Sequence, residues 1–375
     1  RQRSWPGAMF PRFCGSLFDG PNPKHASASG SMAPTPLAPN QIAHAPVAIR
    51  IPSHPVGRLT YNLASPTGRE GRPAASAMTE DSSTQTLGAL LRPYARRAEA
   101  DLRRWLVAEQ TPAALAEGMA YCCLDGGKRL RAAMVYLAAE ACGAPADGDA
   151  LGRAAAAVEM VHAYSLVHDD LPAMDDDVLR RGRPTAHVKF GEAMAVLIGD
   201  ALLTRAMEVL AGAADGIGGA LVAELARGAG PEGMVAGQVA DMGACDVPEG
   251  VEGLQYVHRR KTGALIVAAA RLGARCASAD AETLATLTRY AESLGLAFQV
   301  FDDLLDVTAE AEQLGKTPGK DAAAGKRTYV SLLGAEQARR LGERHTAEAV
   351  AACPPLGAAG EPLVRLAELL AERTR

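Results

Sequence analysis

The chain predicts an all-α fold of about ten helices. Alanine is abundant and aromatic residues make up only 4% of the 375 residues, a composition that favours helices around an aliphatic core. From Leu87 onward, apolar residues recur at the spacing of one helix face, with charged residues between them. We find no strand-turn-strand signal and no fixed-period repeat after residue 78.

Residues 1–77 differ from the rest of the chain. They hold 12 of the 23 prolines and only two acidic residues, Asp19 and Glu70. Such a segment cannot bury enough apolar surface to offset its ordering entropy, so we expect a disordered extension and a folded domain over 78–375. Met78 is a plausible natural start, and the density of proline suits an amphipathic targeting helix badly, so we favour translated upstream sequence over a transit peptide. We expect a cytoplasmic protein, or an organellar one if residues 1–77 are a genuine transit peptide.

Local signals give the helices in order. Thr111-Pro112 reads as an N-cap and first-turn proline, Asp125-Gly126-Gly127 as a break, and Gly143-Ala144-Pro145 as a stop. The helices expected after the first are 112–124, 130–141, 151–168, 193–211, 217–227, 235–242, 251–272, 281–305, 335–351 and 361–373.

The bulk properties exclude several classes of protein. A net charge of −4 is too small to indicate a nucleic-acid partner. The seven cysteines are scattered without metal-site spacing, which favours reduced thiols in a cytosol-like compartment. No apolar run is long enough to span a membrane.

Two acidic clusters on apolar helices indicate metal binding. Asp302 and Asp306 are four residues apart and share a helix face, with Gln299 on nearly the same side. In the first cluster, Asp169 and Asp175 are six apart, and Pro172 can let the chain turn back so that both reach one metal. Oxygen ligands without nearby His or Cys favour Mg²⁺ or Mn²⁺.

Basic residues lie at helix starts and glycine turns. This placement favours phosphate binding over a solvated face, because backbone N–H groups can also reach an anion there. The residues are Lys128, Arg129, Arg131, Arg180, Arg181, Lys261, Lys316, Lys320, Lys326 and Arg327.

Metal ions and fixed cations above apolar helices suit a reaction in which a polyanion departs. They stabilise charge on the leaving group in a water-poor pocket, and the apolar helices can hold a hydrocarbon. No GxxxxGK[ST] loop and no Ser/His/Asp or Cys/His arrangement is evident. Ionisation of an allylic diphosphate fits all of these features.

The motifs resemble those of trans-prenyl diphosphate synthases. DDLPAMDDD followed by RRGRPTAH looks like the first aspartate-rich motif of that family, and FQVFDDLLD looks like the second. GGKRLR, HAYSLVHDD, GQVAD, HRRKTGAL and GKRTYVSLLG follow the family order over roughly 80–375. The resemblance implies a helical isoprenoid-synthase bundle around a central cavity, usually a homodimer.

The resemblance also implies roles for individual residues. Asp169 and Asp175 would bind two Mg²⁺ ions and Asp302 a third, with Asp170 and Asp306 as further acids of the metal site. Thr262 and Gln299 would lie near the reacting carbons. The allylic diphosphate would be held by Arg180, Lys261, Lys316 and Lys326, and isopentenyl diphosphate by Lys128, Arg129, Arg131, His162 and Arg181.

Product length is the finer question. Tyr164 and Ser165 lie about one helical turn, roughly 5–8 Å, before Asp169, where a bulky side chain can form the floor under a growing chain. A tyrosine at that place, together with DDxxxxD, resembles bacterial farnesyl diphosphate synthases. A geranylgeranyl diphosphate synthase, a class I terpene cyclase and a non-catalytic subunit of a heteromeric synthase remain alternatives. The second diphosphate site argues against the cyclase, and two intact acidic clusters argue against the non-catalytic subunit.

Overall fold

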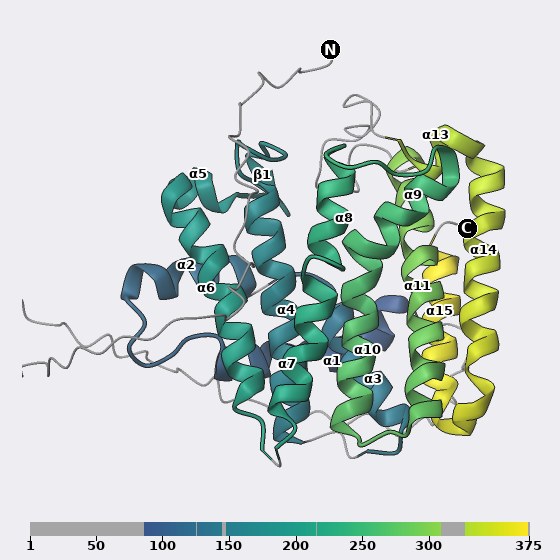
Figure 1. Ribbon diagram of the computed structural model, residues 1–375, viewed down its shortest axis with the longest axis horizontal. Helices are drawn as coiled ribbons and strands as arrows, with labels where there is room; N and C mark the ends of the chain where they lie inside the picture. The colour runs from purple at the N-terminus through teal and green to yellow at the C-terminus, as the bar shows by residue number, and fades with distance from the viewer. Residues whose placement is uncertain (1–85, 125, 145–147, 215, 309–326, 374–375) are drawn as a thin grey trace, which may run out of the picture. The chain divides into compact units, whose positions relative to one another are not determined.

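The all-α prediction is confirmed by the computed structural model (Figure 1). The model describes residues 86–124, 126–144, 148–214, 216–308 and 327–373. The expectations for residues 1–77, Lys316, Lys320 and Lys326 lie outside these ranges.

The α-helices follow the expected order, and most of their bounds agree with the predicted ones to within two or three residues. They are α1 Leu87–Trp105, α2 Ala113–Cys123, α3 Leu130–Ala141, α4 Asp149–Asp169, α5 Ala186–Phe190, α6 Glu192–Ala211, α7 Gly218–Ala229, α8 Met234–Asp241, α9 Gly250–His258, α10 Ala264–Cys276, α11 Ala281–Thr308, α13 Tyr329–Leu333, α14 Ala335–Ala352 and α15 Glu361–Glu372. A π-helical segment, Arg259–Gly263, joins α9 to α10, and a 3₁₀ segment, Pro354–Gly360, precedes α15.

Helix α4 lies at the centre of the core and carries the first acidic cluster at its end. Its small-residue run Ala154–Ala157 is completely buried, as is most of the facing helix α3. On the other side of α3, Gly273 of α10 sits so close to the Val135 carbonyl that a side chain there would overlap it. Small residues thus let the central helices approach closely, and this packing fixes where α4 ends.

Two predictions of secondary structure were wrong. The single helix expected over 251–272 is divided by the π-helical segment, and neighbouring helices approach this segment closely. A Cβ at Gly237 of α8 would overlap the Lys261 backbone, and Gly295 of α11 packs on Gly263. Bulges of this kind often occur at functional sites, where they redirect side chains.

The second wrong prediction concerns strands. A two-stranded antiparallel hairpin, β1 Leu179–Arg180 and β2 Arg183–Pro184, follows the first acidic cluster. Its loop residues Arg181 and Gly182 both have positive φ, +53° and +73°, as a two-residue hairpin loop with a right-handed strand twist requires. The only sequence signal for this hairpin was the Arg-Gly pair of its loop, because strands of two residues are too short to show alternating polar and apolar residues. The five-residue helices α5 and α13 were missed for the same reason.

Candidate active site

The chain turns back at the end of α4, as the position of Pro172 predicted. The backbone N–H of Asp175 donates to the Asp169 carbonyl at 2.8 Å, and that of Asp177 donates to the Asp170 carbonyl at 3.2 Å. Asp176 adopts a positive φ of +53° inside this turn. The turn therefore brings Asp169 and Asp175 together, although they are six residues apart.

The environment of Asp169 suits a bound cation. The pKa of Asp169 is raised to about 6, mainly by burial. Asp175 and Asp170 also raise it, whereas Lys261 and Arg180 lower it. Two carboxylates that repel each other in a water-poor place are stabilised by a positive ion. The donor set is oxygen only, which fits Mg²⁺.

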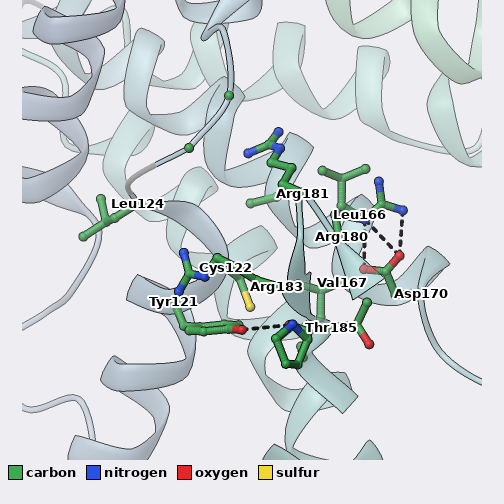
Figure 2. Close-up of a pocket in the computed structure, with 15 residues that line it drawn as sticks. Tyr121, Cys122, Leu124, Leu166, Val167, Asp170, Arg180, Arg181, Arg183 and Thr185 are labelled. Carbon is green, nitrogen blue, oxygen red and sulfur yellow. Dashed lines mark hydrogen bonds and ion pairs between the residues drawn. The ribbon is translucent and has the colours of Figure 1, made fainter. Parts of the chain in front are cut away.

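Asp170 is held differently from its neighbour. Arg180 Nε donates to both oxygens of the buried Asp170 carboxylate at 2.9 Å, and Arg180 Nη2 donates to Asp170 Oδ1 at 2.6 Å. Figure 2 shows this pair beside a cavity of about 250 Å³ that the hairpin and α2 line. The Asp170 carboxylate is thus engaged by a guanidinium on the hairpin, and it fixes where the hairpin lies.

The π-helical segment presents Lys261 towards the first acidic cluster. Burial would lower the pKa of Lys261, but Asp241, Asp169 and Asp175 raise it above its ordinary value. The ammonium donates to Asp241 Oδ2 at 2.6 Å. Lys261 therefore stays charged beside the acids. Asp241, which lies in the GQVAD motif, is a partner that sequence reasoning did not single out.

A basic cavity of about 420 Å³ brings together all five residues expected to hold isopentenyl diphosphate. Lys128 lies at its wall with Asp302, and partial burial together with Arg373 lowers the Lys128 pKa while Asp302 opposes the decrease. Arg373, in the last turn of the described chain, had not been singled out. The lining includes Lys128, Arg129, Arg131, His162, Arg181, Phe298, Asp302 and Arg373.

The electrostatics of this basic cavity favour an anion. Withdrawal from water, and then Arg131 and Arg181, hold the pKa of His162 well below its usual range. Among the described residues, the buried Nε of Arg131 has no hydrogen-bond partner. A bound anion would satisfy that donor and neutralise the cations around the imidazole.

Two glycines shape the wall behind Arg181. Side-chain atoms of Arg181 pack against Gly126 and Gly127, and a Cβ at Gly127 would come within 2.9 Å of its guanidinium. Gly127 also has a φ of +83°, which favours glycine. The Gly-Gly break therefore serves the site by leaving room for an arginine from the hairpin.

Arg129 differs from the other cations of the basic cavity because its guanidinium is used inside the protein. It donates to Glu99 Oε2 at 2.8 Å, to the Cys123 carbonyl at 2.6 Å and to Glu159 Oε2 at 3.3 Å. The other Glu159 oxygen accepts from the Ala132 N–H at 3.1 Å, at the start of α3. This buried network holds the backbone from which Lys128 and Arg131 project.

In the second acidic cluster, neighbouring aspartates do different things. Asp302 lines the basic cavity, whereas buried Asp303 accepts from the Tyr329 N–H at 2.8 Å and anchors α13. Asp306 and Gln299 are half-buried on the same helix, and neither lines the basic cavity. Within the described ranges, no three His, Cys, Asp or Glu groups are close enough to form a complete metal site.

An apolar cavity of about 360 Å³ lies between α4, α8 and the π-helical segment. Asp169, Lys261 and Thr262 contribute to its lining, and most of the remaining lining surface is apolar. Arg131 and His162 line both this cavity and the basic one, so the two meet at these side chains. The apolar lining comes from Leu166, Met174, Met234, Val235, Val239 and Met242, and the residues expected to set product length, Tyr164 and Ser165, are also part of it.

The comparisons with known proteins agree with this geometry. The family model for polyprenyl synthetase matches residues 112–352, which is more than half of the chain. The chain belongs to the polyprenyl synthetase family. It is a prenyltransferase of the kind that elongates prenyl chains.

Individual relatives carry different product names. The chain is 50% identical to farnesyl diphosphate synthase of Escherichia coli over 238 residues, 62% of this chain and 78% of the relative. It is 41% identical to a chloroplastic geranylfarnesyl diphosphate synthase of Leucosceptrum canum over 308 residues, 76% of this chain and 84% of the relative. An apo crystal structure of an FPP/GFPP synthase from Zymomonas mobilis superposes with a TM-score of 0.66 at 34% identity, covering 76% of this chain and 98% of that one. In the described part of the chain, no helix is long and apolar enough to cross a membrane.

Proposed function

We propose that this polyprenyl synthetase condenses isopentenyl diphosphate with dimethylallyl and geranyl diphosphates to give farnesyl diphosphate. The observation that carries the proposal is the pair of cavities meeting at Arg131 and His162. One cavity is basic and suits the diphosphate of the second substrate. The other is lined by Asp169, which lies near Asp175, by Lys261 and by mainly apolar side chains, which suits an allylic diphosphate and its hydrocarbon chain.

The allylic substrate would lie with its diphosphate against Asp169, Asp175 and Lys261 and its chain towards α8. Mg²⁺ held by these aspartates from one side and by Asp302 from the other would supply charge stabilisation for the departing diphosphate. Each wall contributes too few carboxylates for a complete metal site, so diphosphate oxygens would complete the coordination. Lys316 and Lys326 are proposed to add positive charge on the same side.

The acceptor would lie in the basic cavity, with its diphosphate on Lys128, Arg131 and Arg181. Burial and the neighbouring arginines lower the pKa of His162, which favours a neutral imidazole that would donate a hydrogen bond to the acceptor. Arg129 would support this site from beneath instead of contacting the substrate, since Glu99, Glu159 and the Cys123 carbonyl occupy its donors.

The supporting roles extend to the acidic clusters. Asp170 would position Arg180, which remains near enough to the first cluster to lower the pKa of Asp169. Asp306 and Gln299 would line the face of α11 from which Asp302 projects, and Thr262 would lie beside the reacting carbons. Arg180 would then serve the allylic diphosphate while keeping its carboxylate partner.

The product length follows from Tyr164. Its ring lines the apolar cavity one turn below Asp169 and is only 8% exposed, which suits a floor. Ser165 is small and leaves space for a chain longer than ten carbons. A C20 or longer product is the second candidate, because relatives of this chain include synthases named for longer products.

We further propose a homodimer in the cytoplasm. Leu197 of α6 is 54% exposed and Val188 of the adjoining α5 is 50% exposed, an apolar face that a second copy would cover. The six described cysteines are free thiols, as a reducing compartment favours. Light scattering coupled to size exclusion would report a dimer mass, and a monomer mass at micromolar concentration would contradict this part of the proposal.

The central experiment is a product assay. Purified protein is incubated with dimethylallyl diphosphate, isopentenyl diphosphate and Mg²⁺, and the dephosphorylated products are sized. We expect a C15 alcohol from the wild-type protein and no turnover from Asp169→Ala at unchanged helicity. Lys128→Ala should raise KM for isopentenyl diphosphate at least about tenfold, since a charge-assisted contact is lost, while KM for the allylic substrate changes little. A cyclic hydrocarbon, or turnover by Asp169→Ala, would refute the proposal.

A further inference from the structure

His168 lies between the proposed floor of the apolar cavity and helix α6. Its ring meets the Tyr164 ring edge-on, with centroids 5.7 Å apart and an interplanar angle of 84°. On its other side, Nε2 lies 3.1 Å from the Val196 carbonyl oxygen. Since a carbonyl can only accept, this contact places the proton on Nε2 and holds the imidazole against α6.

Helix α6 has a notch that fits this imidazole. Gly199 lies directly beside the His168 ring, and a Cβ there would overlap Nε2, Cδ2 and Cε1. In the helix interior, glycine is destabilising relative to alanine, so a glycine here needs a reason other than helix formation. The reason that the geometry offers is room for the ring of His168.

Tyr164 and His168 are four residues apart on α4 and therefore share a face. Both side chains line the apolar cavity. A tyrosine side chain has only two torsions, and the edge-on contact with the imidazole restricts the ring of Tyr164 on the side where the two rings meet. Gly199, the His168 imidazole and the Tyr164 ring thus form a continuous row of contacts from α6 to the cavity floor.

We propose that His168 is a positioning residue that fixes the Tyr164 ring and thereby limits the length of the prenyl product. The inference rests on the proposed function, in which Tyr164 is the floor of the apolar cavity. It adds that the floor is held from α6, through His168 and the notch at Gly199.

The test is a set of variants whose products are sized under identical conditions. Because the C15 product is itself the substrate of the next addition, the C20 to C15 ratio is compared at equal consumption of isopentenyl diphosphate, so that a lower overall rate does not imitate the effect. We expect His168→Ala to raise this ratio roughly three- to tenfold, the loss expected from one aromatic contact. His168→Phe keeps an aromatic ring beside Tyr164 and should stay nearer to the wild-type ratio than His168→Ala.

A second variant changes the same row of contacts from helix α6. Gly199→Ala should displace the imidazole and lengthen the product although His168 itself is retained. Gly219→Ala is the matched control, because Gly219 is an exposed helical glycine and a Cβ there meets nothing within 4 Å. If Gly199→Ala and Gly219→Ala give the wild-type ratio alike, the proposal is wrong.

Tyr164→Ala separates this inference from the proposed function. If Tyr164→Ala leaves a C15 product, the floor itself is misassigned and the inference is overturned with it. If Tyr164→Ala lengthens the product and His168→Ala does not, the floor stands and only the inference is overturned. Adding His168→Ala to Tyr164→Ala should give no further lengthening, and a further increase would show that His168 is itself a wall and would also overturn the positioning role.

Discussion

The buried pair of Arg129 and Glu159 gives the sharpest prediction of stability. Replacing Arg129 by Met removes three hydrogen bonds and leaves Glu159, whose side chain is 4% exposed, without its guanidinium. Breaking a buried ion pair by removing one partner costs about 3–5 kcal/mol, because a charge stays buried and uncompensated. We therefore expect the free energy of unfolding to fall by about that amount.

Urea denaturation followed by circular dichroism measures this loss as a lower midpoint at unchanged slope. Arg340→Met is the matched control, since its partner Glu336 is exposed and pairs of that kind contribute about 0.2–1 kcal/mol. Equal midpoints for the two variants would refute the reasoning.

A double variant tests the cause of the loss. Arg129→Met combined with Glu159→Leu removes the stranded carboxylate as well, so it should be more stable than Arg129→Met alone. If the double variant is no more stable, the stranded carboxylate is not the main cause of the loss, and the hydrogen bonds of Arg129 to Glu99 and to the Cys123 carbonyl account for it instead.

Two further predictions concern the π-helical segment and its neighbour. Gly237→Ala would place a methyl group against the Lys261 backbone, so we expect a loss of about 1–3 kcal/mol in unfolding free energy and a lower kcat. The control variant Gly219→Ala should change neither quantity. An unchanged kcat for Gly237→Ala would contradict the role of the close approach. Burial, opposed by Asp241 and assisted by Lys261, lowers the pKa of His258 from its ordinary value to about 4. Between pH 6.5 and 4 the unfolded chain then binds more protons than the folded one, so this group leaves stability constant above pH 6.5 and reduces it as the pH falls towards 4. His258→Phe should flatten that part of the decline in urea midpoints measured from pH 7.5 to 5, and identical slopes for both proteins would contradict it.

The sequence was sufficient for the features that depend on local spacing. Helical periodicity gave the class and most helix bounds, and the pair of acidic clusters with glycine-rich turns gave the chemistry. The five residues expected to hold the acceptor do line one cavity, although Arg129 turned out to face inwards.

The features that were missed depend on contacts between distant segments. The π-helical segment is approached closely by Gly237 and Gly295 from two other helices, and the periodicity of residues 251–272 does not show these contacts. Arg373 enters the basic cavity from the last helix, far from the motifs in sequence. The pairing of Arg129 with Glu159 joins residues 30 apart, and periodicity could place both as helical without showing that they meet.

Under the proposed assignment of substrates, the side chains that line both cavities would link the affinities of the two substrates. Arg131 and His162 line both cavities, so the first diphosphate to bind would reduce the positive potential that attracts the second. Such a coupling is reciprocal, since each ligand must change the dissociation constant of the other by the same factor. Two anions attracted by the same positive groups would weaken each other's binding, and in the proposed mechanism the metal ions bound with the allylic substrate would offset this effect. Substrate inhibition at low magnesium would be the kinetic expression of that balance.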